Sequence, residues 1–110
     1  MTSKDKLLNL LGLAMRARKL STGEELVLND VRSKRAKLVI ISTDASNNTI
    51  KNVSNKCQSY NVQLEQVCTR YELGYSLGKD ARVTIGILDA GFAKSMKDLI
   101  RDMNEERSYE

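Results

Sequence analysis

The sequence contains no histidine, no tryptophan and no proline. Without histidine, the chain lacks the side chain that most often serves as a general base or a metal ligand. Its two cysteines, Cys57 and Cys68, form no CxxC pair and are too few for the disulfide framework of a small secreted domain. We therefore expect reduced thiols, a cytoplasmic location, no metal ion and no cofactor. Cys68 is expected to be the more exposed thiol, because it follows a predicted strand.

Long apolar runs and phosphate-binding loops are also missing. No run reaches the roughly 18 apolar residues that a transmembrane helix requires, and the N-terminal leucine cluster is followed by Arg16, Arg18 and Lys19 instead of a small-residue cleavage site. Neither G-x-x-x-x-G-K-[ST] nor G-x-G-x-x-G is present. We expect no membrane association, assign no catalytic residue and predict that the protein is not an enzyme.

Positive charge is concentrated near the N-terminus. The net charge is +4, yet residues 1–37 alone carry an excess of five positive charges. The clusters "RARK" (16–19) and "RSKRAK" (32–37) each follow a predicted helix. Cations at helix C-termini interact favourably with the helix dipole, but these clusters contain more charge than that role needs. The asymmetry favours a polyanionic partner, most often nucleic acid, over an ordinary solvated surface.

Apolar spacing predicts helices and strands in alternation. We expect helices over 5–18, 21–33, 43–60, 70–78 and 90–106, and strands over 36–42, 62–67 and 82–89, with a short strand within 19–22. This order predicts an α/β fold, a three-layer α-β-α sandwich with a small mixed sheet of about four strands. We expect one domain over residues 1–110, with an ordered core at roughly 4–103 and a charged C-terminal tail.

Two carboxylates follow predicted strands, where open α/β sheets often bind ligands. They are Asp44 and Asp89, and each also precedes a predicted helix. Aspartate is a favoured helix cap, so capping is the preferred interpretation. A small-ligand or enzymatic domain that uses these two residues is the less favoured alternative.

Three blocks of the sequence together resemble the kink-turn-binding ribosomal protein superfamily, which includes archaeal L-seven-Ae and eukaryotic L-thirty-e, and within it the bacterial YlxQ-like branch. The blocks are Gly23 at the start of the second helix, "AKLVIISTDAS" (36–46) and "VCTRYELGYSLGK" (67–79). The resemblance extends over nearly the whole chain, roughly residues 4–103. It implies a non-catalytic RNA-binding protein of the ribosomal type.

The third block carries the family motif [ST]-[KR]-x-x-L-G-x-x-x-G, here as Thr69, Arg70, Leu73, Gly74 and Gly78. Each glycine costs a helix interior about 0.5–1 kcal/mol relative to alanine, so both need another reason. The resemblance supplies one. It implies that Leu73 packs under the sheet while the two glycines let a short helix approach neighbouring backbone closely.

Family members hold kinked RNA between the start of the second helix and the loop after the strand at 62–67. The helix start carries a G-x-N-E-x-x-K pattern that reads sheared G·A pairs. Here Glu25, Leu26 and Asn29 occupy the positions of its Asn, Glu and Lys. Leu26 and Asn29 favour the main alternative, a protein-interaction module that has kept the fold and lost kink-turn recognition.

We expect contacts with structured RNA from residues of three kinds. Cations would meet phosphates, Gly23 would allow close backbone approach, and Glu25 and Asn29 would contact bases. The full set is Lys19, Gly23, Glu24, Glu25, Asn29, Lys34, Arg35, Val67, Cys68, Thr69 and Arg70. The few aromatic residues show no stacking platform for single strands. The expected partner is rRNA or a kinked stem, with the ribosome or ribosomal proteins as further partners.

Overall fold

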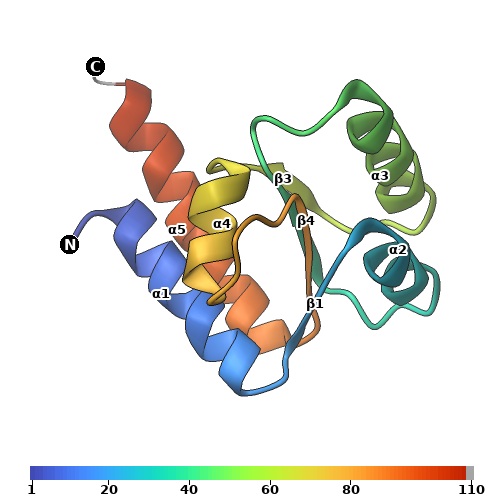
Figure 1. Cartoon of the computed structure of the whole chain (residues 1–110), viewed down its shortest axis with the longest axis horizontal. Helices are drawn as coiled ribbons and strands as arrows, with labels where there is room; N and C mark the ends of the chain where they lie inside the picture. The colour runs from blue at the N-terminus through green and yellow to red at the C-terminus, as the bar shows by residue number, and fades with distance from the viewer. Residues whose placement is uncertain (109–110) are drawn as a thin grey trace.

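A computed structural model of the chain describes residues 1–108 (Figure 1). Its helices are α1 (Ser3–Arg16), α2 (Glu24–Arg32), α3 (Asn47–Ser59), α4 (Arg70–Ser76) and α5 (Ala90–Ser108). Its strands are β1 (Leu20–Thr22), β2 (Leu38–Ile41), β3 (Leu64–Gln66) and β4 (Thr84–Ile87). The alternation of helices and strands predicted from apolar spacing is confirmed.

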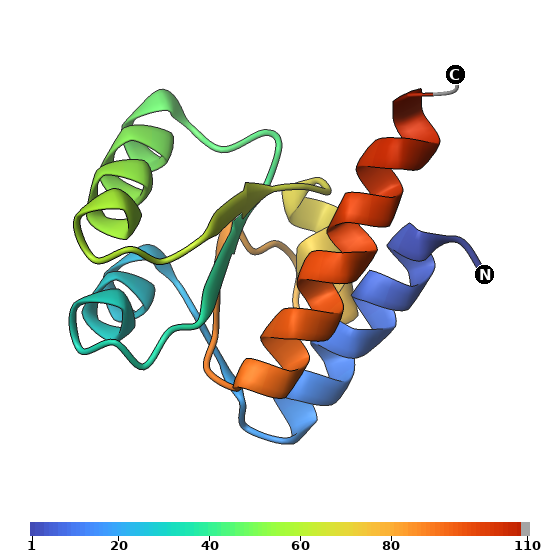
Figure 2. The same cartoon turned by 180° about the vertical axis from the view of Figure 1, so that it is seen from behind.

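The four strands form one mixed sheet in the order β1-β4-β2-β3. Strand β4 runs antiparallel to both β1 and β2, whereas β2 and β3 are parallel. Helices α1, α4 and α5 cover one face of this sheet, and α2 and α3 cover the other (Figures 1 and 2). The predicted three-layer sandwich is therefore confirmed.

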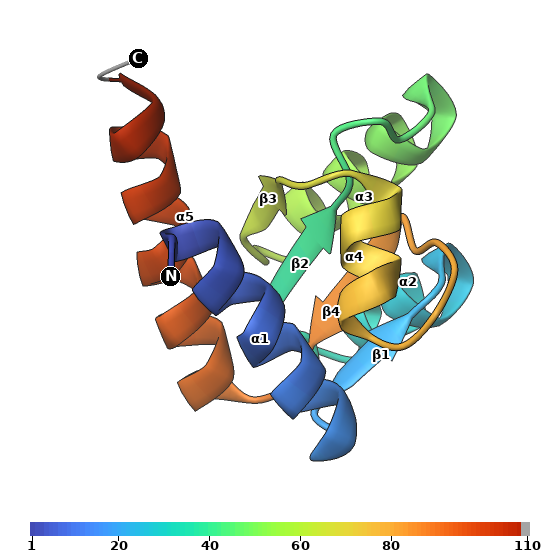
Figure 3. The ribbon, with the colours of Figure 1, turned by 60° about the vertical axis from the view of Figure 1, so that its left-hand side comes forward.

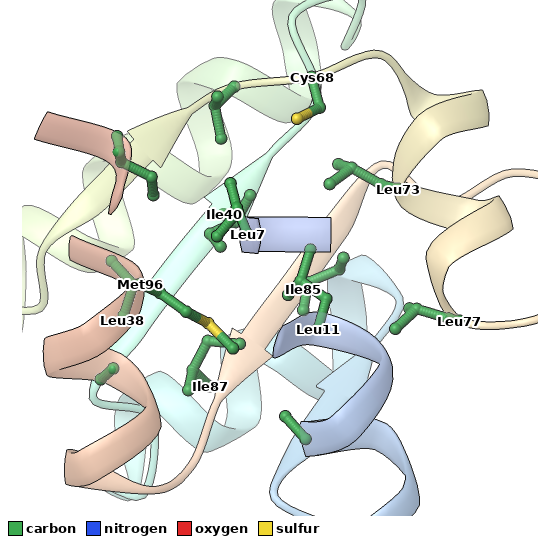
Figure 4. Close-up of a cluster of buried hydrophobic side chains, with 14 of the residues drawn as sticks. Leu7, Leu11, Leu38, Ile40, Cys68, Leu73, Leu77, Ile85, Ile87 and Met96 are labelled. Atoms are coloured by element: carbon green, nitrogen blue, oxygen red, sulfur yellow. The ribbon is translucent and has the colours of Figure 1, made fainter. Parts of the chain in front are cut away.

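Strand β2 is buried on both faces, which explains its continuous apolar run. Leu38 and Ile40 point into the larger core cluster beneath α1, α4 and α5. Figure 4 shows their neighbours in that cluster, which include Leu7, Leu11, Leu73, Ile85, Ile87 and Met96. Val39 and Ile41 point to the opposite face, where they join the smaller cluster beneath α2 and α3. Successive strand side chains alternate between faces, so one strand supplies both cores.

Several helix ends differ from the sequence-based expectation. The helix expected from residue 21 begins at Glu24, because Ser21 and Thr22 pair with β4 instead. The helix expected from residue 43 begins at Asn47, where the Ser46 hydroxyl accepts a hydrogen bond from the Thr49 backbone N–H at 3.2 Å. Polar caps and strand pairing, which apolar spacing does not report, set these boundaries.

The C-terminal helix is longer than expected. Helix α5 continues to Ser108, whereas the sequence suggested an ordered core that ends near residue 103. Met103 is 9% exposed, so α5 still packs against the core at this residue. The last two residues of the expected charged tail lie outside the described residues.

The two carboxylates that follow strands lie at opposite ends of the strands of the sheet. Asp89 caps α5, because its Oδ2 accepts from the Phe92 backbone N–H at 2.9 Å, as expected. The capping role expected for Asp44 is wrong: its Oδ1 accepts from the Arg70 backbone N–H at 3.1 Å, and Ser46 caps α3. Because β2 and β4 are antiparallel, their C-terminal ends point in opposite directions and the two carboxylates share no site.

Candidate functional site

The segments that the sequence singled out meet along one edge of the sheet, at one end of its four strands. We call it the Gly23 edge; it comprises the residues that follow β1, β2 and β3 and those that precede β4. The Gly23 backbone N–H donates to the Thr84 carbonyl at 3.1 Å, and the Ser42 N–H donates to the Val83 carbonyl at 2.9 Å. Strand β3 ends at the same edge because it is parallel to β2. The start of α2 therefore lies close to the loop after β2 and the start of α4.

The start of α2 has an open, glycine-specific geometry. Gly23 is the residue that precedes the helix, and its φ of +97° is a conformation that residues with a side chain rarely adopt. A Cβ built there would meet no atom within 4 Å, so the space beside Gly23 is open. No side chain caps this helix end. Its first backbone N–H groups are therefore positioned to donate to an anion or to a base acceptor.

A hollow of about 240 Å³ lies beside this helix start. Its lining comes from the starts of α2, α3 and α4 and from the segment that precedes β4. The lining residues are Gly23, Glu24, Ser46, Thr49, Arg70, Ala81, Arg82, Val83 and Thr84. Two guanidinium groups and one carboxylate thus surround a space that a ligand could enter. Figure 3 shows how α4 stands in front of the sheet next to this region.

Arg70 and Arg82 are held next to each other. The Arg82 backbone N–H donates to the Arg70 carbonyl at 2.9 Å, and Arg82 Nη1 donates to the Ala81 carbonyl at 2.6 Å. Arg70 Nη2 donates to the Asp44 carbonyl at 2.6 Å, while its Nε lies 3.4 Å from Asp44 Oδ2. Sequence reasoning found Arg70 and missed Arg82. The sequence did show a cation two residues before a buried strand. It did not show that this strand, β4, pairs antiparallel with β2, which is what brings Arg82 to this edge.

Glu24 has a structural bond that the sequence did not suggest. Its Oε1 accepts from the Thr49 hydroxyl at 2.8 Å, which ties the start of α2 to the start of α3. Glu25, one residue further, is exposed, and so is Leu26, whose exposure is 53%. The exposed Asn29 is engaged within its helix, since its Oδ1 accepts from Arg32 Nη1 at 2.7 Å. Glu24 is the α2 side chain that lines the hollow, and Glu25 and Leu26 are exposed in the same first turn of the helix.

The loop after β3 does not present apolar side chains at the surface. Val67 and Cys68 are 5% and 7% exposed and belong to the larger core cluster. Their expected role in flanking RNA is corrected, because both side chains pack inward. Thr69 caps α4: its hydroxyl accepts from the Glu72 backbone N–H at 3.2 Å. What this loop offers at the Gly23 edge is the Arg70 side chain.

The remaining cations lie at the other end of the strands. Lys19 precedes β1, whereas Gly23 follows it, and Lys34 and Arg35 follow the C-terminal end of α2. A helix of nine residues separates that end from its start by about 13 Å. The predicted RNA-contacting residues therefore divide into two groups. Gly23, Glu25 and Arg70 share one edge, while the three cations lie at the opposite edge.

Two further properties concern residues 1–108 as a whole. In this part of the chain, no helix is both long and apolar enough to cross a membrane. The same residues include no group of three or more cysteine, aspartate or glutamate side chains arranged to hold a metal ion.

Comparisons with known proteins agree with this fold. The model of the "Ribosomal protein L7Ae/L30e/S12e/Gadd45 family" matches residues 5–97. The "RNA-binding protein YlxQ" of Bacillus subtilis (strain 168) is 50% identical over 91 residues, which cover 83% of this chain and 91% of the relative. The "RNA-binding protein YlxQ" of Enterococcus faecium is 46% identical over 98 residues, which cover 89% and 94%. Both names describe binding and not a reaction.

Solved structures show the same architecture. A protein of unknown function from Bacillus halodurans C superimposes with a TM-score of 0.85 at 47% identity, over 87% of this chain and 97% of that one. The Giardia lamblia 15.5kD RNA binding protein superimposes with a TM-score of 0.76 at 19% identity, over 89% and 84%. The second likeness concerns the fold alone. Together with the family match, these findings show that the chain belongs to the ribosomal protein L7Ae/L30e/S12e/Gadd45 family and that it is similar to its YlxQ members.

Proposed function

We propose that this protein binds structured RNA at the Gly23 edge and does so without catalysis. The observation that carries the proposal is the uncapped start of α2, which opens onto a hollow flanked by Arg70 and Arg82. Helix-start N–H groups and guanidinium groups suit phosphates and base acceptors. The two relatives named as RNA-binding proteins support the same partner.

Each part of the edge has a distinct role in this proposal. The first-turn N–H groups of α2 donate to acceptors on the RNA, and the absence of a side chain at Gly23 allows close approach of the two backbones. Arg70 and Arg82 supply positive charge for phosphates. The exposed Glu25 accepts from base amino groups. Glu24 acts indirectly, by holding α2 against α3 through Thr49.

The RNA that suits this edge best is a kinked stem, with rRNA in the cytoplasm as its source. The open backbone at Gly23 supports a kinked partner, because a bend brings bases and phosphates together at one helix end. Leu26 at an acidic position of the family pattern removes one base acceptor. We therefore expect the protein to bind a kinked stem more tightly than a straight duplex. The ratio of these two affinities should be smaller than in a protein with a polar residue at position 26.

Fluorescence anisotropy with two labelled RNAs of equal length, a kink-turn hairpin and a straight duplex, tests this proposal. Wild type should prefer the kink-turn RNA, and Arg82→Gln should weaken that binding and lower the steepness of the salt dependence by about one phosphate contact. Arg101→Gln, on α5, is the matched control. If wild type and Arg82→Gln bound each RNA with the same affinity, and neither protein preferred the kink-turn RNA, the use of this edge would be contradicted.

A protein partner is the second candidate, and the exposed Leu26 is the observation that favours it. An apolar side chain that is 53% exposed in the first turn of α2 suits contact with another protein better than contact with phosphate. Leu26→Ser should then abolish capture of that partner from cell extract and leave RNA binding unchanged. Loss of RNA binding in Leu26→Ser would instead place this residue in the RNA contact.

A further inference from the structure

The two basic clusters of the sequence meet at the edge opposite Gly23. We call it the Lys19 edge and define it by six exposed cations: Arg16, Arg18, Lys19, Lys34, Arg35 and Lys37. The Lys19 carbonyl accepts from the Leu88 N–H at 2.8 Å, and the Lys37 N–H donates to the Ile87 carbonyl at 2.7 Å. Lys19 and Lys37 therefore flank the end of β4 on its two sides. Neighbouring strands lie about 4.8 Å apart, so these residues are about 10 Å apart.

The turns after α1 and α2 place the remaining cations beside this row. Both turns lie toward the lower side of the molecule in Figure 1, away from the loop that joins β2 to α3. Arg18 belongs to the first turn, directly after α1, whose last residue is Arg16, and Lys34 and Arg35 belong to the second. Segments far apart in sequence thus form one basic surface across the end of the sheet.

Two of these cations occupy an unusual backbone position. Arg18 and Lys34 have φ values of +59° and +63°, immediately after the caps of α1 and α2. The equivalent positions after α3 and α4 are held by Asn61 and Gly78, residues that tolerate this conformation well. An arginine or lysine there is sterically strained. The helix dipole offsets part of the cost of this strain, and the choice of two long cations in tight turns points to use of their charge.

Acidic side chains at this edge leave most of the positive charge uncompensated. Asp30 is buried and lies 3.5 Å from Arg35 Nη1, so it balances that one residue. Asp89 is engaged as the cap of α5. Among the described residues, Arg35 is the member of the six that forms an ion pair. The Arg16 guanidinium lies back along α1, near Gly12, and Lys37 Nζ donates to the Lys34 carbonyl at 3.3 Å while keeping its charge. Arg18, Lys19, Lys34 and Lys37 therefore carry exposed charge, without an ion-pair partner among the described residues, that can face a polyanion.

We propose that the Lys19 edge is a second RNA-binding surface, which contacts the phosphate backbone of a helical segment. The inference rests on the proposed function and extends it, since the protein would then hold two separate stretches of RNA, one at each end of its sheet. The surface is rich in Lys and Arg, and these side chains meet phosphates without reading sequence. The four residues of β2 alone separate the two edges by about 13 Å, so one phosphate cannot contact both.

A variant of this edge with four fewer positive charges can be made at low cost to folding. Arg18→Asn and Lys34→Asn remove two charges and place a tolerant residue at each left-handed position. Lys19→Gln and Lys37→Gln remove two more. Arg35 is kept, because its loss would leave the buried Asp30 unpaired. The matched control removes the same charge from α1 and α5 through Lys6→Gln, Lys97→Gln, Arg101→Gln and Arg107→Gln.

Binding of a straight RNA duplex and of a kink-turn hairpin is measured by anisotropy over a range of salt concentrations. We expect the four-residue edge variant to bind the straight duplex on the order of tenfold or more weakly than wild type at low salt. The slope of log K against log salt should become shallower by about 3.6, as for four lost phosphate contacts on a duplex. The control variant should keep most of the affinity and slope of wild type.

The outcomes separate this inference from the proposed function. If the edge variant binds both RNAs with the affinity and slope of wild type while Arg82→Gln weakens the kink-turn complex, the second surface is wrong and the Gly23 edge stands. If Arg82→Gln has no effect while the edge variant loses duplex binding, the proposed use of the Gly23 edge is wrong and the second surface stands. The inference would also be overturned if the control variant lost as much RNA affinity as the edge variant. The same would follow if the Lys19 edge bound poly-glutamate and no RNA.

A direct readout complements the affinities. In the 12.4 kDa protein, backbone amide NMR signals can be followed one by one during titration with the straight duplex. We expect shifts concentrated at residues 16–19 and 34–37, with little change at 23–25. Shifts confined to the Gly23 edge would contradict the second surface.

Discussion

Gly74 of α4 lies directly against the backbone of Ala81: a Cβ built on Gly74 would stand 2.6 Å from the Ala81 Cα. Ala81 precedes Arg82, so this contact places one wall of the hollow at the Gly23 edge. Gly78 has a different reason, since its φ is +72° and a Cβ there would meet no atom within 4 Å. The implied close approach is confirmed for Gly74 and wrong for Gly78, which ends α4. Leu73, which is fully buried, packs under the sheet as implied.

This difference predicts unequal costs for the two glycines. Gly74→Ala should lower the free energy of unfolding by about 2 kcal/mol or more, because the methyl group would overlap backbone atoms that cannot rotate away. Gly78→Ala should cost about 1 kcal/mol, from the left-handed conformation alone. Urea denaturation measures both values. Gly78→Asn is the control and should lose less than Gly78→Ala; a harmless Gly74→Ala would show that α4 can shift freely away from Ala81.

An ion pair between α1 and α4 predicts a dependence of stability on pH. Burial opposes ionisation of Glu72, but the Lys4 ammonium and the Thr69 backbone N–H outweigh it and hold the Glu72 pKa below its ordinary value of 4.5. A lowered carboxyl pKa gives stability that is fully present above about pH 4.5 and is lost as pH falls through the folded-state pKa. The pair is partly exposed, so we expect about 0.5–1 kcal/mol.

Urea midpoints measured between about pH 3 and about pH 7 would show this loss, and Lys4→Gln should flatten the profile. The same contact with Glu72 raises the Lys4 pKa, so Lys4 stays protonated throughout that range and the loss of stability comes from protonation of Glu72. Lys6→Gln, an exposed neighbour on α1, is the control. An unchanged profile in Lys4→Gln would mean that other carboxylates cause the acid sensitivity.

The cysteines should react slowly with thiol reagents in the native protein. Cys68 is the more exposed thiol, as expected, but both thiols are buried: Cys57 and Cys68 are 2% and 7% exposed, and burial raises the pKa of each thiol to about 11. Because the thiolate is the reactive form, labelling at neutral pH should be far slower than in urea for both residues. Mass spectrometry after timed alkylation measures each rate. Rapid native labelling of Cys68 would indicate that the loop after β3 opens.

Substitution at Gly23 cannot separate RNA contact from folding. Its φ of +97° means that any side chain would strain the start of α2, so Gly23→Val would weaken binding and stability together. Exposed positions of α2 avoid this difficulty. Leu26→Glu and Asn29→Lys restore the family pattern on side chains that face solvent.

We expect the double variant Leu26→Glu/Asn29→Lys to bind a kink-turn RNA more tightly than wild type. The glutamate adds a base acceptor and the lysine adds a charge for phosphate, which should also steepen the salt dependence by about one contact. Leu26→Gln/Asn29→Gln is the control for the loss of the native side chains, with circular dichroism as the check on folding. A well-folded double variant with unchanged affinity would favour a protein partner for this surface.

The sequence by itself determined the layers of this protein. The apolar run at 36–42 required a strand buried on both faces, and the amphipathic segments around it required helices on each side. It also determined the family, through motif residues such as Arg70 and Leu73. These features depend on local periodicity and residue type, which a linear sequence contains in full.

Tertiary structure decided which residues share a surface. The antiparallel pairing of β4 with β1 and β2 placed Arg82 beside Gly23 and placed Lys19 beside Lys37. The length of α2 separates Gly23, which precedes that helix, from Lys34, which follows it. Whether a cation faces one edge or the other depends on strand direction and strand order, and these are set by contacts between residues far apart in the chain. Composition reported the positive charge, while the sheet topology divided it between two surfaces.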